Sequence, residues 1–128
     1  MSYYFSKTIT TSFEDAVSRV TDVLKKEGFG VLTDIDVQAT LKKKLDTEFR
    51  KYRILGACNP PFAYQALQAE DKIGTMLPCN VIVQELGGGV VEVAAVDPAA
   101  SMAAVDNPKL GEIAGQVRAK LKNVIDGL

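Results

Sequence analysis

Two short segments of the chain pair a cysteine with an asparagine at the end of a predicted strand. One reads Gly-Ala-Cys-Asn-Pro and places Cys58 and Asn59 where a strand ends. The other reads Leu-Pro-Cys-Asn-Val and places Cys79 and Asn80 where a strand begins. A thiolate is both a nucleophile and a ligand for soft metals, and a helix N-terminus just after Cys58 would favour the thiolate form. These residue types predict a paired thiol site that is either redox-active or binds a soft metal.

Packing is the alternative interpretation of the same residues. Cysteine is among the most buried residue types and often only fills space. The two cysteines are 21 positions apart, which is not the spacing of a redox pair, and the sequence holds no histidine to complete a four-ligand zinc site. Asn59 is expected to cap the helix that follows it. Asn80 lies inside a strand, where asparagine is disfavoured, so its side chain is expected to bond to a loop or a ligand.

A third candidate position lies near residue 100. Asp97, followed by Pro98, could be a lone catalytic carboxylate, although Asp before Pro at a strand end is more typical of a turn. Met102 could be a soft ligand, although a core or interface role is more typical of methionine. The three glycines at residues 87–89 join two strands and lack the Lys-Ser/Thr ending of a phosphate loop.

Composition and charge bound the class of protein. The chain has 128 residues, of which 47% are hydrophobic and 24% charged, which fits one globular domain whose core needs no disulfide or structural metal. Its net charge is -1, with 15 basic and 16 acidic residues. Proteins that bind nucleic acid need clustered Lys and Arg in excess. We therefore expect no nucleic-acid partner.

The N-terminal sequence predicts a cellular location. Residues 1–5 lack the basic and long apolar stretches of a signal peptide. No apolar run approaches the roughly 20 residues that span a bilayer. We therefore expect a cytoplasmic protein without a membrane partner, whose two cysteines are reduced.

Hydrophobic periodicity divides the chain into alternating strands and helices. The predicted strands cover residues 2–10, 29–35, 52–58, 79–86 and 90–96. The helices are predicted to begin at capping residues Ser12, Asp36, Asn59 and either Asp106 or Asn107. The second helix would turn Val37, Leu41 and Leu45 to one face, and residues 99–107 are expected to form a loop of small residues.

The order of these elements predicts the fold class. It is β-α-β-α-β-α-β-β-α in one domain, and the closing hairpin at residues 87–89 requires an antiparallel pair. Strands with one polar face suggest a sheet covered by helices on one side and open on the other. We therefore predict an α+β fold with a mainly antiparallel sheet and helices on one face. If the strands that carry Cys58 and Cys79 pair antiparallel, the two Cys-Asn segments would converge.

The Cys-Asn segments resemble the signature of domain-of-unknown-function family 302, a family of small bacterial and archaeal proteins with no assigned activity. Other positions match the family pattern along nearly the whole chain: Gly28-Phe29, Asp36-Val37, Thr40-Leu41, Leu45, Ala63, Leu67, Asp97-Pro98 and Met102. Asp46 departs from it, since relatives often carry glycine there. The resemblance implies a layout similar to the TATA-binding-protein-like fold, and it implies a homodimer. It implies no reaction, cofactor or catalytic residue.

Three functional hypotheses follow. The first is a non-enzymatic homodimeric binding module with a pocket for a small ligand or a metal near Cys58, Asn59, Cys79 and Asn80, because no catalytic set is recognisable. The second is a thiol-based redox protein or enzyme that uses Cys58 as its reactive thiolate. The third is an interaction domain that uses the open face of the sheet or the apolar edge of the final helix.

Overall fold

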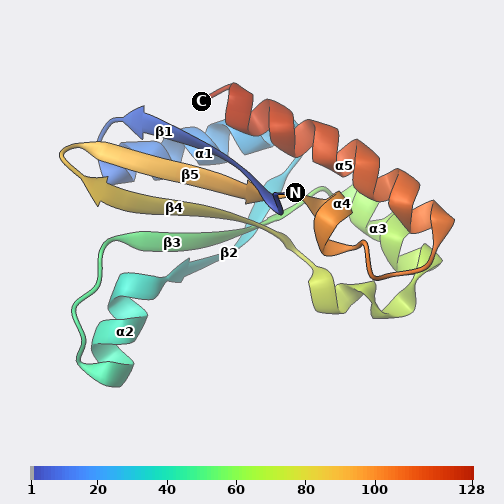
Figure 1. Ribbon diagram of the computed structural model, residues 1–128, viewed down its shortest axis with the longest axis horizontal. Helices are drawn as coiled ribbons and strands as arrows, with labels where there is room; N and C mark the ends of the chain where they lie inside the picture. The colour runs from blue at the N-terminus through green and yellow to red at the C-terminus, as the bar shows by residue number, and fades with distance from the viewer. Residues whose placement is uncertain (1) are drawn as a thin grey trace.

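The computed structural model describes residues 2–128 as one sheet with helices (Figure 1). Its elements follow in this order: β1 (Tyr4–Thr10), α1 (Phe13–Lys26), β2 (Gly30–Asp36), α2 (Val37–Leu45), β3 (Tyr52–Cys58), α3 (Pro60–Ala69), the 3-10 helix η1 (Asp71–Met76), β4 (Cys79–Gly87), β5 (Val90–Val96), α4 (Pro98–Ser101) and α5 (Pro108–Asp126). The predicted strands and long helices are all present, with bounds that differ by a few residues.

The five strands form one antiparallel sheet. Their order is β1-β5-β4-β3-β2, and every neighbouring pair runs antiparallel. The turn between β4 and β5 contains three glycines with φ of 97°, 63° and 77°, a backbone region in which a Cβ would be strained. The predicted α+β class with a mainly antiparallel sheet is confirmed.

Helices α1 and α5 cover one face of this sheet (Figure 1). Each helix repeats apolar residues every three or four positions, so a continuous stripe is buried. The stripe of α1 consists of Phe13, Ala16, Val20 and Leu24. It packs with α5 against alternate residues of β4 and β5, namely Val81, Val83, Val91, Val93 and Ala95. Within residues 2–128, no helix combines the length and apolarity that crossing a membrane requires.

Three of the predicted helix caps form as expected. The side chain of Ser12 accepts a hydrogen bond from the backbone N–H of Asp15 at 3.1 Å, and Asp36 accepts one from Ala39 at 2.9 Å. Asn107, one of the two residues considered for the last helix, accepts from Lys109 at 3.1 Å. These bonds satisfy N–H groups that the first helical turn leaves unpaired.

The predicted loop at residues 99–107 is partly wrong. Pro98–Ser101 forms the short helix α4, because Asp97 caps it and a proline at its first position needs no N–H donor. The 3-10 helix η1 was also not predicted, since six residues are too few to show helical periodicity. Together with α3 and α5 these short helices bury a second apolar cluster, which consists of Ala66, Ile73, Met102, Leu110 and Ala114.

Helix α2 lies apart from the layer of α1 and α5 (Figure 1). We predicted that it would turn Val37, Leu41 and Leu45 to one face. No residue of the helix is fully buried, and Leu45 is 67% exposed. The apolar spacing was present, yet β2 is the edge strand of the sheet, so the helix that follows it extends beyond the core. Asp46 ends α2 with a positive φ of 50°.

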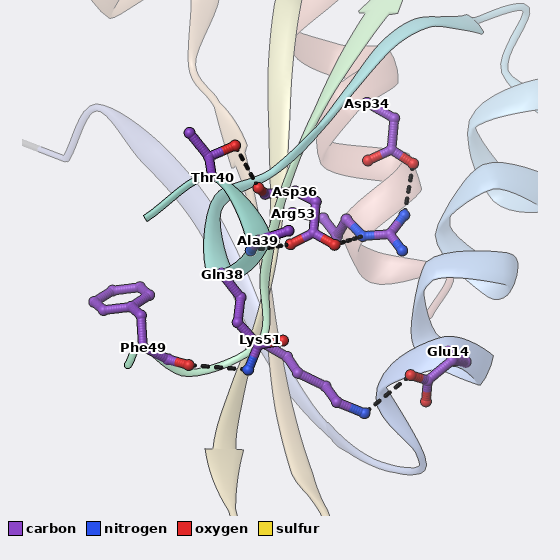
Figure 2. A network of polar contacts seen from close by, with 9 residues as sticks. All are labelled: Glu14, Asp34, Asp36, Gln38, Ala39, Thr40, Phe49, Lys51 and Arg53. Carbon is purple, nitrogen blue, oxygen red and sulfur yellow. Dashed lines mark hydrogen bonds and ion pairs between the residues drawn. The ribbon is translucent and has the colours of Figure 1, made fainter. Parts of the chain in front are cut away.

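Polar contacts hold α2 against the sheet edge (Figure 2). Arg53 on β3 approaches Asp34 at 2.7 Å and Asp36 at 3.8 Å, and Asp36 also caps α2. Gln38 donates to the carbonyl of Phe49 at 2.9 Å. These exposed polar contacts, rather than core packing, hold α2 in place, and each of them contributes little stability.

Candidate functional site

A small cavity lies where β3 and β4 meet the helices α3, α4 and α5. Its volume is about 30 Å³. Eleven of its fifteen lining residues have pure hydrocarbon side chains. Of the described residues that line it, four have a side chain with a heteroatom: Cys58, Asn59, Cys79 and Met102. The cavity is therefore an apolar space with three sulfur atoms and one amide in its wall.

The antiparallel pairing of β3 and β4 brings the two cysteines to this cavity. Ala57 lies opposite Cys79, so Cys58 is one residue beyond that pair. Cys79 is 9% exposed and Cys58 is half-buried, and both carry thiols. Burial, and to a lesser extent the neighbouring Cys58, raise the pKa of the Cys79 thiol to about 11. Cys79 is therefore protonated at neutral pH.

Asn59 has a different role from the predicted one. Its side chain does not cap α3 through a hydrogen bond to any residue of 2–128, and its amide instead donates to the carbonyl of Glu27 at 3.3 Å. Pro60 and Pro61 occupy the first two positions of α3 and have no N–H, so fewer donors there need a cap. Glu27 ends α1, and the buried Asn59 therefore joins the end of α1 to the start of α3 beside the cavity.

Met102 reaches the cavity through α4, which Asp97 fixes in place. One carboxylate oxygen of Asp97 accepts from the N–H of Ala99 at 3.0 Å, and the other accepts from Nε of Arg118 at 3.1 Å. Asp97 is 7% exposed and lies just before Pro98, which lines the cavity. Asp97 thus caps α4 and joins it to α5 through the ion pair with Arg118. Met102 lies at the other end of α4.

Asn80 lies on the opposite face of the sheet. It is exposed and lines a separate, open hollow of about 370 Å³ together with Tyr52, Ile82 and Gln84. Consecutive strand residues point to opposite faces, so Cys79 and Asn80 cannot both face one pocket while β4 stays regular. Cys58, Asn59 and Cys79 all line the same cavity, and Asn80 does not.

Sequence reasoning missed two residues that shape the cavity. Arg118, which pairs with Asp97, lies on the predicted α5 and had no signal of its own, because surface arginines are common on helices. Gly56 is the second. A Cβ at Gly56 would overlap Oγ1 of Thr33 and would lie 2.7 Å from Cγ of Pro78, so only glycine lets Pro78 reach the cavity wall. Its strand position, one residue before an alanine and a cysteine, could have suggested such a close approach.

Comparison with known proteins gives the family. The model of the family described as domain of unknown function DUF302 matches residues 5–128. The chain belongs to the DUF302 family. The crystal structure of an uncharacterized conserved DUF302 protein from Bacillus stearothermophilus is similar to it, with a TM-score of 0.90 and 28% sequence identity over 98% of each chain. No match is found among curated proteins.

The donor atoms of this DUF302 protein limit the chemistry at the cavity. Within residues 2–128, no three Cys, Asp or Glu side chains gather in an arrangement that could hold a metal ion. At the cavity the donors are two thiols, one thioether and one amide, surrounded by hydrocarbon. Such a wall can enclose an apolar group, or it can offer sulfur to a soft ion.

Proposed function

We propose that the protein is a cytoplasmic, non-enzymatic homodimeric binding module, and that its pocket for a small molecule or a soft metal is the cavity beside Cys58, Asn59, Cys79 and Met102. One observation carries the proposal. These four side chains come from β3, the start of α3, β4 and the end of α4, and they line the same cavity. Asp97 supports this pocket through α4, whereas Asn80 lies outside it.

The apolar wall of the cavity supports a role in ligand binding. Ligand sites in proteins are mostly apolar with a few placed polar groups, which is the composition of this cavity. Its sides are set by three different layers: the strand ends, α3 and the α4–α5 pair. The cavity lies between the two apolar clusters, since Ala57 and Cys79 of its wall belong to the main core and Met102 and Ala114 to the smaller cluster.

The open face of the sheet supports the homodimer. Five strands of about seven residues make a face of roughly 24 by 23 Å, or about 550 Å². A partner in a specific interface contributes on the order of 800 Å². Exposed Leu32, Ile35 and Leu45, at the edge next to this face, would add to it. A second copy with the same open face is the simplest cover, since two-fold interfaces use one patch twice.

A thermal-shift screen tests the pocket. A ligand at about 100 times its Kd stabilises a protein by about 2.7 kcal/mol, which raises the Tm of a domain of this size by roughly 10 °C. We expect such a shift with at least one class of small apolar metabolite or soft metal ion. Ala63→Leu, which adds bulk at the cavity wall, should remove the shift, and Ala119→Leu on the exposed face of α5 should keep it.

The outcome against the proposal is equally concrete. If no metabolite or metal class stabilises the native protein, the pocket has no ligand of those kinds. If a ligand stabilises the native protein and Ala63→Leu to the same extent, binding occurs elsewhere.

A further inference from the structure

We propose that the open face of the sheet carries a second binding site, and that this site takes a small aromatic amine. Such a ligand has a primary ammonium group at one end and an aromatic ring at the other. The inference goes beyond the proposed cavity, because the hollow on the open face shares no lining residue with it. It comes from the shape, the charge and the aromatic rings of this hollow of about 370 Å³.

The strand register sets the shape of the hollow. Its floor contains Ile82 on β4 and Ala94 on β5, which lie directly opposite each other. Gln84 and Glu92 form the next pair on the same face, and Asn80 lies two residues before Ile82. Four residues of strand therefore separate Asn80 from Gln84, a distance of about 14 Å. The volume of about 370 Å³ is within the range of small-molecule sites in proteins.

One end of the hollow holds a carboxylate without a cationic partner among residues 2–128. Gln84 donates through Nε2 to Oε1 of Glu92 at 2.7 Å, and its Oε1 accepts from Nε of Arg50 at 2.8 Å. Arg50 thus orients Gln84 and reaches Glu92 only through it. No Lys or Arg in this range forms an ion pair with the half-buried Glu92. An ammonium group is the direct complement of such a carboxylate.

Aromatic rings line both ends of the hollow. Tyr4 pairs with Val96 at the end away from the carboxylate, and its ring meets that of Tyr3 edge to face with 4.9 Å between the centroids. Tyr52 lies at the carboxylate end, where its ring already has the guanidinium carbon of Arg50 at 5.6 Å. Ring faces attract cations and also pack against other rings. The two ends therefore suit the two ends of an aromatic amine.

Asn80 adds a polar group at the end away from the carboxylate. Its side chain is exposed and forms no hydrogen bond to another residue of 2–128. Asparagine is disfavoured inside a strand, so local packing does not account for it. Its amide can both donate and accept, which suits a hydroxyl on the aromatic ring of the ligand.

The proposed homodimer would enclose this hollow, and this step alone rests on the proposed function. Ala94 lies near the middle of the open face, so pairing of two copies there would take both Glu92 carboxylates away from water. A buried charge without a partner is costly. An ammonium group in each hollow would remove that cost, so the amine and the dimer should stabilise each other.

An NMR titration of the full-length protein with tyramine tests the inference. Tyrosol, in which a hydroxyl replaces the amine, is the matched neutral probe. We expect tyramine at millimolar concentration to shift the backbone amide signals of Ile82 and Ala94, and to leave the signal of Ala114 in the cavity wall unchanged. Tyrosol should bind at least roughly tenfold more weakly, because hydrogen bonds to charged groups are stronger than neutral ones.

Two variants assign the contacts. Glu92→Gln should weaken tyramine binding roughly tenfold and should give tyramine and tyrosol equal affinities, since the charge is removed. Asn80→Ala should weaken tyramine binding about fivefold, and it should not change the affinity for 2-phenylethylamine, which lacks the ring hydroxyl. Glu112→Gln is the matched control, because Glu112 is exposed on α5 away from the open face, and it should bind tyramine as the native protein does.

An absence of binding by both tyramine and 2-phenylethylamine would overturn the inference, and so would equal affinities of the native protein and Glu92→Gln for tyramine. If a ligand stabilises the native protein but not Ala63→Leu, while neither amine binds, the cavity stands and this site does not. Native tyramine affinity in Ala63→Leu would support a site separate from the cavity.

Light scattering with and without tyramine tests the coupling to the dimer. We expect tyramine to increase the fraction of dimer at a fixed protein concentration. Tyramine binding through Glu92 with no change in mass would support the site, and it would contradict its enclosure by a second copy.

Discussion

At the cavity, the two thiols differ in their access to water. Cys79 is buried with a pKa of about 11, so only about one molecule in ten thousand carries its thiolate at pH 7. Cys58 is half-buried. We expect iodoacetamide to label Cys58 first and Cys79 at least 100-fold more slowly at pH 7, with Cys79 labelling increasing up to about pH 11. Peptide mass spectrometry over a pH series measures both rates.

Urea-unfolded protein, in which both thiols are exposed, is the control for that series. Equal rates in the folded state would contradict the burial of Cys79. Labelling of Cys58 far faster than in the unfolded chain would instead identify an activated thiolate and favour the redox or enzyme alternative.

Gly56 is the second test at the residue scale. An added Cβ would overlap Thr33 and come within 2.7 Å of Pro78, so we expect Gly56→Ala to lower the free energy of unfolding by roughly 1–3 kcal/mol. Gly111→Ala on the exposed side of α5 meets nothing within 4 Å and should stabilise the protein by up to about 1 kcal/mol. Urea denaturation measures both. An unchanged free energy of unfolding in Gly56→Ala would mean that the close approach of Pro78 does not require glycine at this position.

The sequence predicted where the two Cys-Asn segments lie in the fold better than how their side chains point. Cys58 and Cys79 were expected to meet if their strands paired antiparallel, and the register of β3 and β4 brings them to one cavity. Asn80 was grouped with them because it follows Cys79, although strand alternation sends it to the other face. The bond from Asn59 to Glu27 spans 32 residues, and local pattern cannot reveal a contact that depends on tertiary packing.

At the element scale, α4 depends on one carboxylate. Asp97→Ala removes both the cap on Ala99 and the partner of Arg118, and we expect it to cost about 1–2 kcal/mol of unfolding free energy. Asp97→Asn keeps an oxygen for the cap and should cost less, because the ion pair involves a half-exposed arginine. Chemical denaturation compares the two variants. Equal losses would show that the charge, rather than the cap, holds α4.

The length of an element decided whether the sequence could predict it. Helix α5 repeats its apolar stripe over 19 residues, and α1 does so over 14, so periodicity identified both. Helix α4 has four residues and η1 six, which is too short for a period. Helix α2 showed a correct period and a correct cap at Asp36, but periodicity cannot say that no layer lies opposite its apolar side.

For the whole molecule, the proposed homodimer uses the open sheet face. Ala94 lies near the middle of that face on β5, between β1 and β4. Ala94→Arg would place two unpaired charges in a two-fold interface, so we expect the dimer Kd to rise more than 100-fold. Light scattering with size-exclusion chromatography should then give a mass near the 13.8 kDa of one chain instead of twice that value.

Ala119→Arg is the matched control, because Ala119 is exposed on α5 and away from the sheet. It should leave the mass of the native protein unchanged. A native protein that is monomeric at every concentration would contradict the dimer, and a dimer that tolerates Ala94→Arg would place the interface elsewhere.

Strand order is the part of the fold that pattern alone left open. The hairpin at residues 87–89 predicted one antiparallel pair, and the polar alternation predicted one open face. That β1 pairs with β5 and that β3 lies between β2 and β4 depend on contacts far apart along the chain. This order is what brings the end of β3 next to the start of β4, and it therefore determines where the cavity forms.

Native mass spectrometry of the protein purified without reductant or chelator tests the central claim most directly. The account predicts a dimer that carries extra mass in equal amount on each chain, and it predicts that Ala63→Leu loses this mass while Ala119→Leu keeps it. A mass equal to that of the protein alone with both cysteines as free thiols would contradict the account, if incubation with metabolites, Ag(I) or Cu(I) leaves this mass unchanged. The Cys-Asn segments would then serve packing alone.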